Sequence, residues 1–99
     1  MNRLCIALFC GLLTLPVLAA DPDLGRNLAA TCASCHGTNG VALPGSGIDT
    51  LAGQDKERNL QRLKEYRAGI RAATIMHQIS KGYTEEQLIL ILNWFAAQK

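Results

Sequence analysis

The sequence predicts an all-α fold. Apolar residues recur at the three- and four-residue spacing of helices in several stretches, and the strict alternation of a half-buried β-strand appears nowhere. Aspartate or threonine precedes three of these stretches, and glycine follows three of them, as expected for helix starts and ends. The chain has 99 residues and no internal repeat, so it predicts one small domain of short helices.

Residues 1–20 have the organisation of an export signal. Arg3 provides a positive start, and the apolar run that follows closes on small residues. We expect cleavage after Ala19 or Ala20, which leaves residues 21–99 as the mature domain and places it in the periplasm. The run is shorter than the roughly 18 uninterrupted apolar residues of a membrane span, and Pro16 interrupts it, so no stable membrane anchor is expected.

The composition of the mature chain excludes some classes of function. Without Arg3, the chain has nine lysines and arginines and eight aspartates and glutamates, and no long block of like charge occurs. Nucleic acid is therefore not an expected partner. Cys5 and Cys10 leave with the export signal, and only Cys32 and Cys35 remain. A domain of this size has a marginal apolar core of its own, and a covalent cofactor at its centre would supply the missing part.

The first helix is expected to begin after Asp23 and to carry the two remaining cysteines. Leu24 and Leu28 share one face of this helix, which continues toward Cys32. Residues 37–53 follow with five glycines and one proline, a composition that excludes extended regular structure. A loop of this length in a small domain is usually either functional or disordered, and this composition is typical of a loop that wraps around something.

Residues 54–69 predict a second helix with a solvated outer face. Leu60, Leu63 and Tyr66 recur at spacings of three, and charges of alternating sign lie between them. Gly69 ends the pattern.

Two further helices are expected toward the C-terminus. Residues 70–82 predict a short one with an apolar centre. In the last helix Thr84 is the expected N-cap, and Gln87, three positions later, completes a capping box. The apolar run Leu88–Leu92 is too continuous for an exposed helix, so we expect most of its circumference to be covered.

The motif CASCH, residues 32–36, is the strongest chemical signal in the chain. Two cysteines at this spacing on a helical turn can add to the two vinyl groups along one edge of a porphyrin, and the next residue then projects toward the iron. We therefore predict one covalent haem c, attached through Cys32 and Cys35, with His36 as the proximal iron ligand.

Three other interpretations of this motif fit less well. A thioredoxin-like redox pair needs a βαβ context, and this sequence predicts no strands. A tetrahedral zinc site needs two pairs of ligands, whereas the only distant candidate here is His77. A plain disulfide between the two cysteines would leave His36 and the glycine-rich loop without a role.

The second axial ligand follows by elimination. Met76 is the only methionine of the mature chain, and Ile75 and Ile79 give it apolar neighbours. A methionine thioether raises the reduction potential relative to a site with two histidines. His77 is the alternative ligand, although polar Gln78 follows it and favours an outward position. With both axial positions filled, no substrate or O₂ reaches the metal, so the haem would pass single electrons and would not catalyse.

The motif, the single later methionine and the aromatic residues of the last helix resemble a class I cytochrome c. The resemblance covers the whole mature chain, residues 21–99. It implies short helices wrapped around one haem, with the first and last helices crossing beside it. The face that carries Leu24 and Leu28 would then contact Trp94 and Phe95.

A narrower resemblance is to the cytochrome subunit of flavocytochrome c sulfide dehydrogenase. The pattern R-x-x-T-x-M-x-x-I-x-K-G-Y-T of residues 71–84 and the stretch CHGTNGV of residues 35–41 are similar to that subunit. The methionine that binds iron there maps onto Met76. The resemblance implies a chain that is not an enzyme on its own. It would accept electrons from an FAD-containing subunit that oxidises sulfide and pass them to a soluble cytochrome or other acceptor.

Two features depart from this family. Some relatives carry two haem domains, whereas this chain has one CxxCH motif. In monohaem domains a proline carbonyl often accepts a hydrogen bond from the proximal histidine, and Pro44 is the residue available for that place here.

Two other functions are alternatives. The stretch LAGQ, residues 51–54, is shared with the small c4 and c553 cytochromes, which work as free soluble electron carriers. A peroxidase-like or gas-binding haem would require Met76 to be off the iron. Binding of carbon monoxide to the ferrous protein would separate a carrier from a gas-binding haem.

Overall fold

The computed structural model describes residues 20–99, so the predicted export signal lies almost entirely outside the described residues. The elements in chain order are α1 (Leu24–His36), α2 (Lys56–Arg67), α3 (Met76–Ile79), the 3-10 turn η1 (Ser80–Gly82) and α4 (Glu85–Ala96). No strand occurs between residues 20 and 99, which confirms the all-α prediction. Over the same residues, no helix has the length and apolar character needed to cross a membrane.

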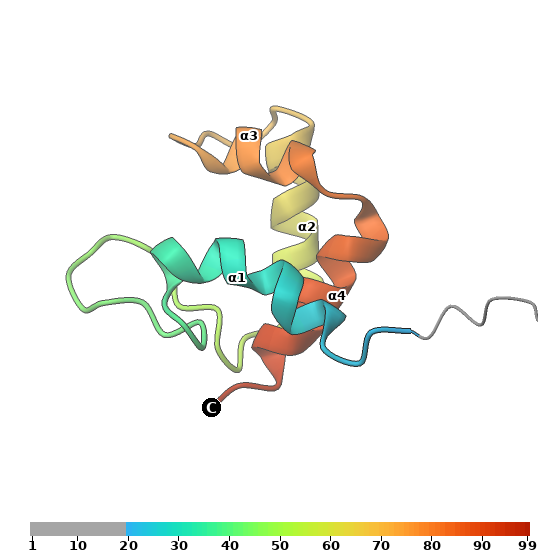
Figure 1. Cartoon of the computed structure of the whole chain (residues 1–99). Coiled ribbons are helices and arrows are strands. Elements are labelled where there is room, and N and C mark those ends of the chain that lie inside the picture. The colour runs from blue at the N-terminus through green and yellow to red at the C-terminus, as the bar shows by residue number, and fades with distance from the viewer. Residues whose placement is uncertain (1–19) are drawn as a thin grey trace, which may run out of the picture.

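Helices α1 and α4 cross and form the centre of the fold (Figure 1). They approach closely at Gly25, where a Cβ atom would lie only 2.9 Å from the backbone oxygen of Leu90. Leu28 packs against the core, but Leu24 is 42 % exposed, so only part of the expected face of α1 contacts α4. The buried residues of the core cluster are Ala29, Leu88, Ile91 and Phe95.

Helix α4 begins with the predicted capping box. Thr84 Oγ1 accepts a hydrogen bond from the Gln87 backbone N–H at 3.1 Å, and Gln87 Oε1 accepts one from the Thr84 N–H at 2.9 Å. The prediction that most of the helix is covered is wrong at Ile89 and Leu90, which are 39 % and 37 % exposed. Helices α1 and α2 cover one face of α4 and leave the other to solvent. The buried residues on the covered face are Leu88, Ile91, Leu92 and Phe95.

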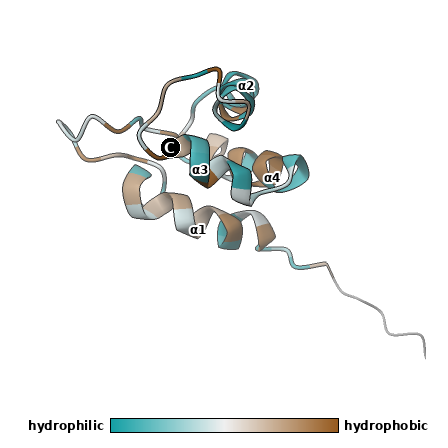
Figure 2. Cartoon of the chain, turned by 90° about the horizontal axis from the view of Figure 1, so that it is seen from above, coloured by the Kyte–Doolittle hydropathy of each residue, from teal (hydrophilic) through white to brown (hydrophobic). Residues whose placement is uncertain are grey.

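Helix α2 is mainly hydrophilic, as Figure 2 shows. Its N-cap is Asp55, whose Oδ1 accepts hydrogen bonds from two backbone N–H groups of the first turn at 2.9 and 3.1 Å. The helix ends shortly before Gly69, whose φ of +73° lies in the left-handed region that favours glycine. Leu60 and Leu63 pack against the core, so α2 is held by a narrow apolar stripe.

The segment between α2 and α4 is less helical than the sequence predicts. The short helix expected within residues 70–82 is limited to the four residues of α3 and the turn η1. Ile70 and Ile75 lie before α3 and are 78 % and 52 % exposed. Because the Ile70 side chain remains largely in solvent, it adds no packing that would stabilise a longer helix there.

Candidate haem site

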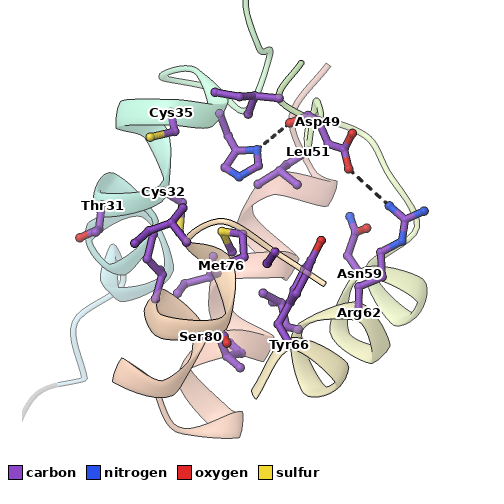
Figure 3. A pocket seen from close by; sticks show the side chains of 18 of the residues that line it. Thr31, Cys32, Cys35, Asp49, Leu51, Asn59, Arg62, Tyr66, Met76 and Ser80 are labelled. Carbon is purple, nitrogen blue, oxygen red and sulfur yellow. Dashed lines mark hydrogen bonds and ion pairs between the residues drawn. The ribbon is translucent and has the colours of Figure 1, made fainter. Parts of the chain in front are cut away.

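A cavity of about 440 Å³ is lined by α1, α2, the segment that carries α3, and α4, and by part of the loop that follows α1 (Figure 3). This volume lies within the usual range of small-molecule sites. The four site residues predicted from the sequence all line it, namely Cys32, Cys35, His36 and Met76. The fold therefore brings the CASCH motif and the distant methionine to one place.

Cys32 and Cys35 lie one helical turn apart on α1, and both line the cavity. Both thiols are free, without a disulfide in the described part of the chain. Cys32 is half-buried against the core and Cys35 is exposed. Burial raises the pKa of the Cys32 thiol, which keeps it protonated at neutral pH. Two free thiols on one side of a helix fit attachment to a porphyrin edge better than they fit a structural disulfide.

His36, the last residue of α1, is oriented by the loop. Its Nδ1 lies 2.6 Å from the backbone oxygen of Asp49. Because a carbonyl oxygen can only accept, Nδ1 carries a proton. In the neutral ring this leaves the lone pair on Nε2, as an imidazole that binds a metal through Nε2 requires. The sequence left open whether Pro44 provides this acceptor. The acceptor is Asp49 instead, and Pro44 is exposed and does not line the cavity.

The turn that brings Asp49 to His36 depends on Gly40. The Gly40 carbonyl accepts hydrogen bonds from the N–H groups of residues 51 and 52 at 2.7 and 3.0 Å, which returns the loop toward α1. The φ of Gly40 is +82°, and a Cβ atom there would lie 2.6 Å from the ring of Phe95. Both the backbone conformation and the contact with α4 therefore require glycine.

Met76 is the first residue of α3, and Figure 3 shows its thioether among the side chains that line the cavity. Ile75 and Ile79 line the cavity beside it. His77 does not belong to the lining, and its Nδ1 is buried without a hydrogen-bond partner in residues 20–99. Of the two candidates for the second axial ligand, Met76 alone is placed at the cavity.

Arg71 ties the segment that carries Met76 back to α2. Its Nε donates to Glu65 Oε2 at 2.7 Å, and its guanidinium carbon lies 5.9 Å from the centre of the Tyr66 ring. Tyr66 itself lines the cavity. The sequence pattern included Arg71, but its contacts could not be read there because they form only where the chain folds back along the end of α2.

We expect the Glu65–Arg71 pair to stabilise the domain at neutral pH and not at acid pH. The hydrogen bond from Arg71 lowers the pKa of Glu65 below its usual value of 4.5. Such a carboxyl stabilises the fold above its unfolded pKa and loses that contribution as the pH falls through its folded pKa. Urea unfolding at a series of pH values should show Glu65→Gln less stable than the parent at pH 7, with a difference that disappears on acidification.

The control for this prediction is the Arg71→Gln background. There, Glu65→Gln should cause a smaller pH-dependent change in the free energy of unfolding, because the main partner that lowers the pKa of Glu65 is gone and only Gln61 and Arg62 remain. If Glu65→Gln and the parent differ in free energy of unfolding by the same amount at neutral and acid pH, the pair with Arg71 does not stabilise the ionised form of Glu65.

One wall of the cavity is polar and comes from α2. Asn59, Arg62 and Tyr66 line it, and Asn59 is buried with only 7 % of its surface exposed. Arg62 Nη1 lies 3.6 Å from Asp49 Oδ2. The sequence did not indicate Asn59 and Arg62 as site residues, because the alternating charges of this helix predict a solvated face. The available signal was their spacing, because residues four and seven positions before Tyr66 lie on the same side of a helix as Tyr66.

A zinc site is not supported by the geometry. Within residues 20–99, no three His, Cys, Asp or Glu side chains are grouped so that they could hold a metal ion. The cavity instead offers one imidazole and one thioether, beside two thiols. This donor set suits an iron that is already held by four porphyrin nitrogens.

Comparisons with known proteins agree with this geometry. The family model for cytochrome c matches residues 22–96. The chain is 37 % identical over 71 residues to the cytochrome subunit of sulfide dehydrogenase of Chlorobaculum tepidum, over 72 % of this chain and 63 % of that protein. It is 32 % identical over 101 residues to cytochrome c4 of Pseudomonas aeruginosa, over 100 % of this chain and 50 % of that protein.

A third relative is the thiosulfate dehydrogenase electron acceptor of Stutzerimonas stutzeri, which is 32 % identical over 83 residues, or 78 % of this chain and 38 % of that protein. The chain thus spans less than two thirds of the length of each of these three relatives. The family model covers most of the chain, including the CASCH motif, Met76 and all four α-helices. The chain therefore belongs to the cytochrome c family, whose cofactor is covalently bound haem c.

Proposed function

We propose that this cytochrome c, an electron carrier by family, holds one haem through thioether bonds to Cys32 and Cys35, with His36 and Met76 as axial iron ligands. The observation that carries the proposal is that all four side chains line a single cavity. The hydrogen bond of His36 Nδ1 to Asp49 supports it further, because it leaves Nε2 available to a metal.

The bound haem supplies one-electron exchange between ferric and ferrous iron. The side chains around the cavity would determine how the haem is held, which oxidation state is favoured and what can reach the iron. Thioether bonds from Cys32 and Cys35 would hold the haem beside α1, and the Met76 sulfur would favour its ferrous state. With His36 and Met76 both bound to the iron, O₂ and substrates would be kept from the metal, and the haem would exchange single electrons without catalysing a reaction.

The polar wall of the cavity would hold the carboxylate groups of the haem. Arg62 can bind a carboxylate through two parallel N–H donors. Asn59 and Tyr66 add an amide and a hydroxyl on the same side of α2. Buried carboxylates need such partners, since an unpaired charge inside a protein is strongly destabilising.

We further propose that the chain acts in the periplasm as the haem subunit of a sulfide dehydrogenase. It would accept electrons from an FAD-containing flavoprotein and pass them to a soluble cytochrome or other acceptor. The similarity to the Chlorobaculum tepidum subunit supports this, as does the pattern of residues 71–84 around Met76. Ile48 and Ile75 line the cavity, so apolar side chains lie around the proposed haem site, and apolar surface is typical of a permanent subunit interface.

A free electron carrier is the second candidate. It is favoured by the similarity to cytochrome c4 and to the thiosulfate dehydrogenase electron acceptor. A free carrier meets its partners transiently and commonly depends on charge steering, so its reduction rate would fall as salt rises. A permanent complex would keep electron transfer within the complex fast at the same salt concentrations.

The test is purification of the native protein at moderate salt, followed by addition of sulfide. We expect co-elution with a flavoprotein and rapid reduction of the haem. Ile75→Ser should weaken this co-elution, whereas Ile89→Ser, which changes an equally apolar exposed residue on α4, should not. If the cytochrome elutes alone and sulfide reduces it no faster than an unrelated cytochrome c, the free-carrier function replaces the subunit function.

A further inference from the structure

The loop between α1 and α2 is held to the rest of the domain at few points. Hydrogen bonds join the beginning of the loop to its end. The Gly40 carbonyl accepts from the N–H groups of residues 51 and 52, and Thr50 Oγ1 accepts from the Ala42 N–H at 3.1 Å. Between these anchors, the hydrogen bonds of residues 43–48 join only members of that stretch to one another. Asp49 lies between this weakly held stretch and residues 50–52, which are hydrogen-bonded to the beginning of the loop.

Asp49 contacts two elements at once, and Figure 3 marks both contacts with dashed lines. Its backbone oxygen accepts from His36 Nδ1 at 2.6 Å, at the end of α1. Its carboxylate Oδ2 lies 3.6 Å from Arg62 Nη1, on α2. One residue of the loop thus connects the end of α1 to a side chain of the polar cavity wall.

We propose that Arg62 is a positioning residue for His36, acting through Asp49. By holding the Asp49 carboxylate, Arg62 keeps the adjacent backbone oxygen within hydrogen-bond reach of His36 Nδ1. This assigns Arg62 a role besides that of binding a haem carboxylate, and it rests on the proposed ligation of iron by His36.

Because the Arg62–Asp49 pair is exposed, we expect it to affect the position of Asp49 more than the stability of the whole domain. The side chains of Arg62 and Asp49 are 38 % and 76 % exposed. An ion pair this open to water contributes little to the free energy of global unfolding. It can still affect the position of Asp49, because residues 43–48, which precede Asp49, make hydrogen bonds only with one another. The hydrogen bond that this position controls sets the tautomer and the basicity of an iron ligand.

The test measures hydrogen exchange of the His36 ring N–H in the ferrous haem-loaded protein by NMR in deuterium oxide. Both Arg62→Gln and Asp49→Asn should accelerate this exchange about two- to fivefold, the range that an exposed ion pair can supply. The double variant should exchange no faster than either single variant, because both changes break the same contact. Arg62→Lys, which keeps the charge, should restore part of the protection.

The matched control is Arg58→Gln, one helical turn earlier on α2. Arg58 bonds to Gln54 and does not line the cavity, so its replacement should leave the exchange unchanged. Acceleration in Arg62→Gln but not in Asp49→Asn would show that Arg62 acts only through the haem, and would overturn the positioning role. If the parent shows no signal of an iron-bound histidine, the ligation by His36 fails first and removes the basis of this inference as well.

Discussion

Replacing Met76 by alanine should open the iron to carbon monoxide. The parent, with both axial positions filled, should bind no carbon monoxide in the ferrous state and should show the weak sulfur-to-iron absorption band in the ferric state. In Met76→Ala we expect the band to disappear and the ferrous haem to bind carbon monoxide at one molecule per haem. Absorption spectra of the two oxidation states measure both changes, and acid–acetone extraction should leave the colour with the polypeptide in both proteins.

The matched control is His77→Ala. His77 adjoins Met76 in the sequence but does not line the cavity, so this variant should keep the sulfur-to-iron band and should not bind carbon monoxide. A band that survives in Met76→Ala would refute the ligation by Met76. If the spectrum of the parent is lost in His77→Ala and kept in Met76→Ala, His77 and not Met76 is the second axial ligand.

Replacing Phe95 by alanine should have the largest effect on stability. Phe95 is 1 % exposed and belongs to the core cluster at the crossing of α1 and α4. Its ring also meets Trp94 edge to face, with the ring centres 5.0 Å apart, and its backbone oxygen accepts from the Gly53 N–H at 3.0 Å. Removing the ring leaves a cavity between α1, α4 and the turn at Gly40, which should cost about 3–5 kcal/mol in the free energy of unfolding.

This loss is large for a small domain, since total stabilities are typically about 5–15 kcal/mol. Urea unfolding of the haem-loaded protein measures it. Leu90→Ala is the control on the same helix, because Leu90 is 37 % exposed and its truncation leaves no comparable cavity. A loss in Phe95→Ala no greater than that in Leu90→Ala would show that the crossing of α1 and α4 is not the main source of stability.

Local sequence was sufficient for the helices and for the chemistry of the motif. The all-α class follows from spacing, and the capping box of Thr84 and Gln87 is formed within three residues. The two cysteines and His36 are close in the sequence and lie on one turn of one helix, so their combination could be recognised without a fold. Met76 could be selected because no other methionine follows the CASCH motif in the sequence.

The features that the sequence did not predict all depend on contacts between distant residues. The acceptor for His36 is a backbone oxygen, and every residue carries one, so Asp49 could be distinguished from Pro44 only by the path of the loop. The exposure of Ile89 and the short extent of α3 likewise depend on which faces have neighbours. Arg62 looked like part of a solvated face because its charge is typical of one. Its place on the cavity wall follows from how α2 packs against α3 and α4, and packing of that kind is a property of the whole fold.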